Sequence, residues 1–180
     1  MGTATHPITS RPSSRSALTL SAKRRHGRSV NAVAAFLNDT LRVPEIYLHF
    51  GGPLRSADVV AADAAGSGDI HAVEVRVATA HTLSTQEVLN VVEKLKQLPA
   101  HFKYLALPTH PAILRLAQNR SLFSSDGLGR IGVIKLIESG DAPPTVELVV
   151  KPERFRVAQP EMVKIERVLT RSHPDMFVRV

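Results

Sequence analysis

The chain has 180 residues, which is enough for one domain with a hydrophobic core and too few for two ordinary domains. It contains no cysteine, which excludes disulfides, zinc sites built on thiolates and a cysteine nucleophile. Its hydrophobic residues, 43% of the total, include no long uninterrupted apolar run, so we expect no transmembrane helix and no membrane partner.

The net charge of +7 is concentrated near the N-terminus. Residues 1–28 hold six of the 23 Lys and Arg residues and none of the 16 Asp and Glu residues, so the remainder is nearly neutral. This segment is rich in Ser, Thr and Pro without apolar periodicity, which predicts a disordered basic arm. We expect the arm to bind nucleic-acid phosphates or to dock into a larger assembly. Its basic residues are Arg11, Arg15, Lys23, Arg24, Arg25 and Arg28.

Two other interpretations of residues 1–28 stay open. An organellar transit peptide is also rich in Arg and Ser and poor in acidic residues. A solvated tail without a partner is the simplest alternative. A secretory signal is disfavoured, because no apolar segment follows the charges. We therefore expect a cytoplasmic protein, or an organellar one if the segment is a transit peptide.

Residues 29–180 alternate helical and extended patterns, which predicts one α/β domain. Ser29 can cap a first helix, and Ser84 with Glu87 has the spacing of a capping box that begins a second. The predicted order is a helix at 29–41, strands at 45–50, 57–62 and 70–78, a helix at 84–98, a strand at 102–107, a helix from 109, strands at 131–137 and 146–151, and a helix at 161–170. This order favours a central mixed β-sheet flanked by helices.

The strands on either side of Gly66-Ser67-Gly68 form a predicted β-hairpin. Alternate side chains of a strand share a face, so Glu74 and Arg76 lie together, opposite the valines of the same strand. The hairpin can bring Asp58 toward Glu74, and two converging carboxylates suit a hard cation such as magnesium. Asp63 is five residues after Asp58 and faces the other side of the strand, so only one of the two can join Glu74.

Asp58 followed by Glu74-Val75-Arg76 resembles the motif of the PD-(D/E)XK nuclease superfamily, in which an Asp on one strand precedes Glu-x-Lys on the next. The predicted order of helix, three strands, helix and strand is also similar to the restriction-endonuclease-like core of that superfamily. The similarity covers about residues 29–137. The chain departs from the motif at Ala57, where the family usually has proline, and at Arg76, where it usually has lysine.

The resemblance implies that Asp58, Glu74 and Arg76 are the catalytic residues. It further implies a magnesium ion held by the two carboxylates and by the backbone carbonyl of Val75. Such an ion lowers the pKa of a bound water and stabilises the charge that develops on a phosphate.

The substitution of the motif lysine limits what this site can do. Arginine can orient water or neutralise a phosphate, but a pKa above about 12 keeps it from releasing a proton. A lysine from the following helix could take that role, and Lys94 and Lys96 are the candidates. Gln86, near the start of the same helix, resembles a glutamine that some relatives place beside the metal.

Two functions of different classes therefore stay open. The first is a nucleic-acid-associated, magnesium-dependent phosphodiesterase whose site is degenerate or active. The second is a non-catalytic structural or assembly subunit that uses the nuclease fold, with or without self-association, and is anchored by its basic arm.

Overall fold

The computed structural model describes residues 14–48, 50–63, 68–77, 84–108, 111, 115, 118–125, 129–140 and 142–174. For residues 14–20, 120, 121 and 125 the description covers the backbone. The principal elements are α1 (Ser14–Asp39), β1 (Glu45–Leu48), β2 (Val59–Ala62), β3 (Ile70–Val75), α2 (Thr85–Gln97), β4 (Phe102–Pro108), β7 (Gly132–Ile137), β8 (Thr145–Val150) and α5 (Gln159–Leu169). Shorter elements are the 3-10 turn η1 (Gly52–Leu54), α4 (Arg120–Phe123), β5 (Ser124–Ser125) and β6 (Gly129–Arg130).

The centre of the molecule is a six-stranded sheet with the strand order β1-β2-β3-β4-β7-β8. The first three strands form an antiparallel meander. Strands β3, β4 and β7 are parallel to one another, and β8 returns antiparallel to β7. The predicted class, an α/β protein with a mixed sheet flanked by helices, is therefore confirmed.

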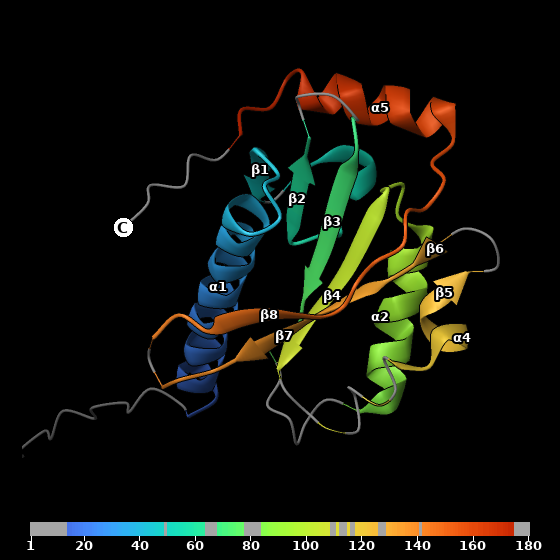
Figure 1. Cartoon of the computed structure of the whole chain (residues 1–180). Coiled ribbons are helices and arrows are strands. Elements are labelled where there is room, and N and C mark those ends of the chain that lie inside the picture. Colours follow the sequence, from blue (N-terminus) through green and yellow to red (C-terminus); the bar gives the residue numbers. More distant parts are fainter. Residues whose placement is uncertain are drawn as a thin grey trace, which may run out of the picture.

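Helices cover both faces of this sheet (Figure 1). On one face, Val33 and Leu37 of α1 are completely buried against Val73 and Val75 of β3. On the other face, α2 packs on β4, and α5 packs on η1 and the β1–β3 meander. Because side chains alternate along a strand, the valines of β3 face α1, whereas Glu74 points toward α2.

The first helix differs from the prediction. It begins at Ser14 and not at Ser29, so residues 14–28 are helical and continue into the packed part of the domain. Ser29 is buried inside the helix and caps nothing. The physical reason is that Ala, Leu, Lys and Arg, which dominate residues 17–25, are good helix formers that a helix already anchored downstream can incorporate.

The local signals elsewhere agree with the structure to within a few residues. The capping box is formed: the Glu87 N–H donates to Ser84 Oγ at 3.2 Å, and the Ser84 N–H donates to Glu87 Oε2 at 2.7 Å. The strand predicted at 45–50 ends at Leu48, and the helix predicted at 161–170 begins at Gln159. Gly66 and Ser67 of the predicted hairpin turn and most of the helix predicted from residue 109 lie outside the described residues.

Candidate functional site

Asp58 is fixed at the end of the hairpin where β3 finishes. Its backbone N–H donates to the Val73 carbonyl at 2.9 Å, and the Val75 N–H donates to Asp58 Oδ2 at 2.7 Å. Directly before β2 begins, the Asp58 carboxylate thus accepts the Val75 N–H in place of a backbone carbonyl of the neighbouring strand. This arrangement holds Asp58 beside the C-terminal end of β3, as the hairpin prediction requires.

Glu74 lies beside Asp58 on the face of β3 that α2 covers. Its side chain is 17% exposed, and its Oε1 is 2.6 Å from an Nη of Arg76. Burial, and then the negative charge of Asp58, raise the pKa of Glu74 to about 7, against the opposing effects of Arg76 and Lys94. Burial and the nearby charge of Asp58 therefore disfavour the ionised form of Glu74.

The two carboxylates share a cavity of about 450 Å³ with residues of α1 and α2. Of the predicted site residues, Asp58, Glu74, Val75, Arg76 and Lys94 line it. The structure therefore brings together the residues of the motif and one of the two candidate lysines.

The side of α2 on which each remaining candidate lies decides whether it lines the cavity. Glu87, Asn90 and Lys94 recur at spacings of three and four residues and line the cavity along one side of the helix. Lys96 is not among the lining residues, and its Nζ lies 2.7 Å from Glu93 Oε1. Gln86 is exposed and donates to Asn90 Oδ1 at 3.0 Å, so the amide that lines the cavity belongs to Asn90.

Arg76 has a mixed role at the cavity. It pairs with Glu74 through one Nη, while its Nε is buried and has no hydrogen-bond partner among the described residues. An unsatisfied buried N–H is costly, whereas the rest of the Arg76 side chain, 40% exposed, lines the cavity and can contact an acceptor such as a phosphate oxygen. The arginine is thus suited to binding an anion and not to proton transfer.

His26 is a cavity residue that sequence reasoning missed. It belongs to α1, and its Nε2 lies 3.3 Å from Asp58 Oδ1. Both oxygens of Asp58 are therefore engaged, one by His26 and one by the Val75 N–H. No motif marked this residue, because it falls in the segment that composition predicts to be disordered.

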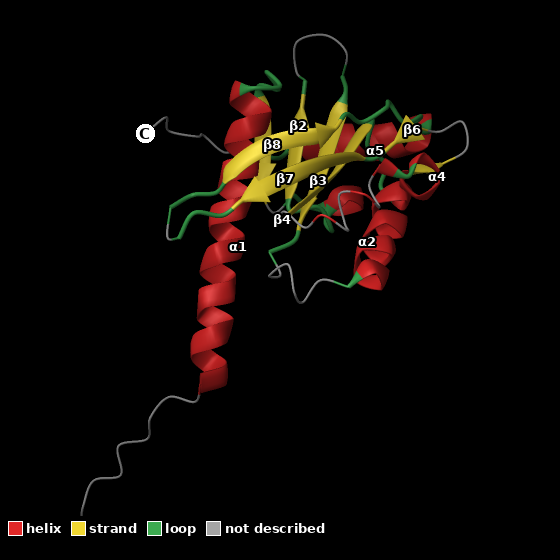
Figure 2. Cartoon of the chain, turned by 60° about the horizontal axis from the view of Figure 1, so that its bottom comes forward, coloured by secondary structure: helices red, strands yellow, loops and turns green. Residues whose placement is uncertain are grey.

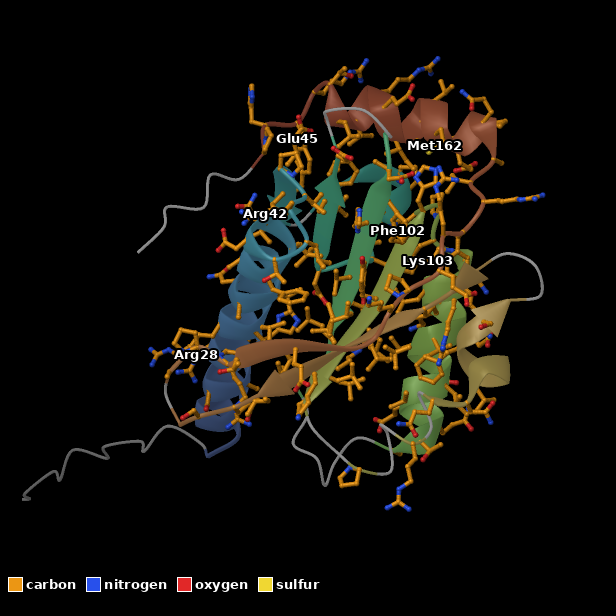
Figure 3. All side chains as sticks on the ribbon, in the orientation of Figure 1. Arg28, Arg42, Glu45, Phe102, Lys103 and Met162 are labelled. Atoms are coloured by element: carbon orange, nitrogen blue, oxygen red, sulfur yellow. The ribbon has the colours of Figure 1, made fainter. Side chains whose placement is uncertain are left out.

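The cations predicted to bind nucleic acid lie on the same helix. Lys23 and Arg24 are exposed, and Arg25 is 3.9 Å from Glu138. Arg28 is half-buried and lies on the lower half of α1 in Figure 3. Arg11 and the side chain of Arg15 lie outside the described part of the chain.

The structure also decides between the two aspartates of β2 and its flanks. The charge of Asp63 acts on His71, near the start of β3, whereas the charge of Asp58 acts on Glu74, near its end. Asp58 is therefore the partner of Glu74. Asp69, at the far end of the hairpin, instead accepts hydrogen bonds from Arg154.

The donor atoms fit a hard divalent cation in kind, since they are two carboxylates and a neighbouring main-chain carbonyl. Mutual repulsion of Asp58 and Glu74, expressed in the raised pKa of Glu74, is an imbalance that a bound cation relieves. Among the described side chains, no group of three or more His, Asp or Glu residues is arranged to hold a metal. A cation here would thus depend on water and substrate oxygens for its other ligands, which is the usual habit of Mg²⁺.

Comparisons with known proteins leave this site to be judged on its own chemistry. A scan of protein-family models and searches of curated proteins and of solved structures found no match for the chain. Within the described residues, no helix combines the length and apolar character needed to cross a membrane.

Proposed function

We propose that this protein is a nucleic-acid-associated, magnesium-dependent phosphodiesterase of the PD-(D/E)XK type. The observation that carries the proposal is the convergence of Asp58, Glu74 and Lys94, from three separate elements, on one cavity. The order of helix, antiparallel meander, helix and parallel strand supports it, because this is the arrangement that the resemblance implies. A cytoplasmic location is the simplest one for such an activity.

In this proposal Asp58, Glu74 and the carbonyl of Val75 hold the cation. The bound ion supplies Lewis-acid stabilisation of the phosphate and a water of lowered pKa. The chain itself contributes orientation: His26 and the Val75 N–H fix Asp58, and the guanidinium of Arg76, which lines the cavity, can contact a phosphate. Lys94 is the side chain that can exchange a proton, since Arg76 stays charged.

The test is magnesium or manganese calorimetry on the wild type, Asp58→Ala and Glu74→Ala, with a nuclease assay on the same samples. We expect the wild type to bind the ion and cleave a nucleic acid, and each variant to lose both activities while keeping its circular dichroism spectrum. Glu161→Ala on α5 is the matched control, because it removes a carboxylate at the other end of the sheet. Cleavage that survives in folded Glu74→Ala would refute the catalytic proposal.

One observation favours a second function, a non-catalytic assembly subunit. The guanidinium of Arg76 already lies 2.6 Å from Glu74, so a cation of the chain itself partly balances the acidic pair. In that case the wild type binds no divalent ion, cleaves nothing, and Arg76→Ala unmasks ion binding by removing the internal cation. Tight binding by the wild type would contradict this second function.

A further inference from the structure

Helix α1 consists of two halves with different surroundings. The C-terminal half is anchored, since Val30, Val33 and Leu37 are buried under the sheet. In the N-terminal half, Lys23 and Arg24 are exposed, and α1 extends well beyond the sheet (Figure 2). At a rise of about 1.5 Å per residue, residues 14–25 account for roughly 18 Å of helix.

The charge of the projecting half has one sign. From Ser14 to Asn38 the helix contains no acidic residue, whereas Lys23, Arg24 and Arg25 are consecutive cations. Arg28 lies one turn from Arg24, and like charges at this spacing destabilise a helix. A phosphodiester backbone that contacts the exposed Lys23 and Arg24 adds the opposite charge to this half of the helix.

Gly27 lies at the junction between the two halves. A Cβ built at this residue meets no atom within 4 Å, so no close contact requires glycine here. A glycine in a helix interior is destabilising by about 1 kcal/mol relative to alanine. The helix is therefore weakest where the anchored half passes into the basic half.

The junction also lies beside the candidate site. His26, the residue before Gly27, contacts Asp58 Oδ1 at 3.3 Å and lines the cavity. Lys23 lies one helical turn from His26, and His26 shares the cavity with the cations Arg76 and Lys94.

We propose that the N-terminal half of α1 is a helical docking arm, jointed at Gly27, that binds a phosphodiester backbone and presents it to the Asp58–Glu74 cavity. The inference rests on the proposed function in taking nucleic acid as the polyanion. The described aromatic side chains are all buried or half-buried, which favours phosphate contacts over base stacking.

The first test measures binding of a short fluorescent DNA duplex by anisotropy, in chelator so that cleavage cannot occur. The double variant Lys23→Gln/Arg24→Gln should weaken binding and lower the slope of log affinity against log salt by roughly two. The matched control, Arg167→Gln/Arg171→Gln, removes two exposed cations at the α5 end and should bind like the wild type. Equal weakening by both pairs would overturn the docking arm.

The second test addresses the joint. Gly27→Ala should increase helicity and tighten binding by about fivefold, because less order has to be gained on docking. Unchanged or weakened binding would show that the arm does not dock as a helix continuous with α1.

The two proposals fail in different ways. If the arm is correct and the catalytic proposal is wrong, the α1 variants lose binding but no Glu74-dependent cleavage exists. If the cavity is catalytic and the arm is wrong, cleavage depends on Glu74 while Lys23→Gln/Arg24→Gln has a wild-type KM. If both are correct, the α1 double variant raises KM and leaves kcat unchanged.

Discussion

The two ends of the sheet carry cavities of nearly equal size that differ in how their charges are arranged. The cavity beside Glu74 measures about 450 Å³, and the one beneath α5, beside His101 and Arg154, about 440 Å³. Met162, which lines the second cavity, lies at the upper end of the molecule in Figure 3, whereas β3 runs downward in Figure 1 and ends beside the first cavity.

Charges at the α5 end are matched. Both Nε and Nη2 of Arg154 donate to Asp69 Oδ1, at 3.0 and 2.8 Å. At the other end, burial and then the charge of Asp58 raise the pKa of Glu74 to about 7. Cavity volume therefore does not distinguish the two ends. The neighbouring carboxylates of Asp58 and Glu74 distinguish them. Acidic groups with a shifted pKa in a cavity are a general indicator of function.

The largest effect should come from the lysine that lines the first cavity. If the proposed activity is present, Lys94→Ala should reduce kcat by about 10²-fold or more, the usual contribution of a positioned proton-transfer group. Lys96→Ala, two residues away on α2, removes a side chain that pairs with Glu93 and should leave kcat unchanged. Steady-state cleavage assays on both variants make the measurement, and equal losses would remove Lys94 from its proposed role.

Acid should weaken the α5 end through His71. The ring is buried, its Nδ1 lies 3.1 Å from Tyr104 Oη, and burial lowers the pKa of His71 to about 4. Its pKa in the unfolded chain is near 6.5, so the unfolded state binds the proton first as the pH falls. The contribution of neutral His71 to the free energy of unfolding is complete above pH 6.5 and is lost toward pH 4, by up to about 3 kcal/mol.

Denaturant unfolding of metal-free wild type and His71→Gln over this pH range isolates the effect. Glutamine keeps a hydrogen-bonding group but does not titrate, so the difference between the two curves should shrink or reverse toward low pH. The comparison uses the difference between wild type and variant because Glu74 changes the stability of both proteins. Its raised pKa increases the free energy of unfolding as the pH falls from about 7 to its unfolded value of 4.5. Parallel curves would mean that His71 is not kept neutral by burial.

The smallest effect should come from the matched charges themselves. Asp69→Ala removes the acceptor of Arg154, whose side chain is 53% exposed and stays solvated. The expected loss is about 1 kcal/mol of unfolding free energy, with metal binding and cleavage unchanged. Thermal unfolding and the cleavage assay check both parts, and a loss of cleavage would extend the functional region to the α5 end.

Several features of the candidate site followed directly from local sequence patterns. Alternation along β3 placed Glu74 opposite the valines, and the hairpin allowed either Asp58 or Asp63, but not both, to join Glu74. The Ser84–Glu87 capping box predicted the start of α2 correctly. These predictions succeed because each depends on periodicity or hydrogen bonding within a few residues of chain.

The choice between Lys94 and Lys96 could not be made in this way. Both lysines lie in the last turn of α2, and helical periodicity fixes only the angle between them. Packing of Val88, Val91, Val92 and Leu95 on the sheet decides which side of the helix faces Glu74. The same limitation hid Asn90, while Gln86 was the residue that the family resemblance suggested.

By itself, the sequence determined the α/β class, the hairpin and the face of β3 that carries Glu74, because hydrophobic periodicity and turn chemistry are local, but it left Asp58 and Asp63 as alternative partners of Glu74. Only the tertiary structure decided that residues 14–28 continue α1 and that His26 contacts Asp58. The composition of that segment predicts disorder when it is considered alone. Its helix is supported by burial of Val30, Val33 and Leu37 further along the same helix, an interaction between segments that no local pattern records.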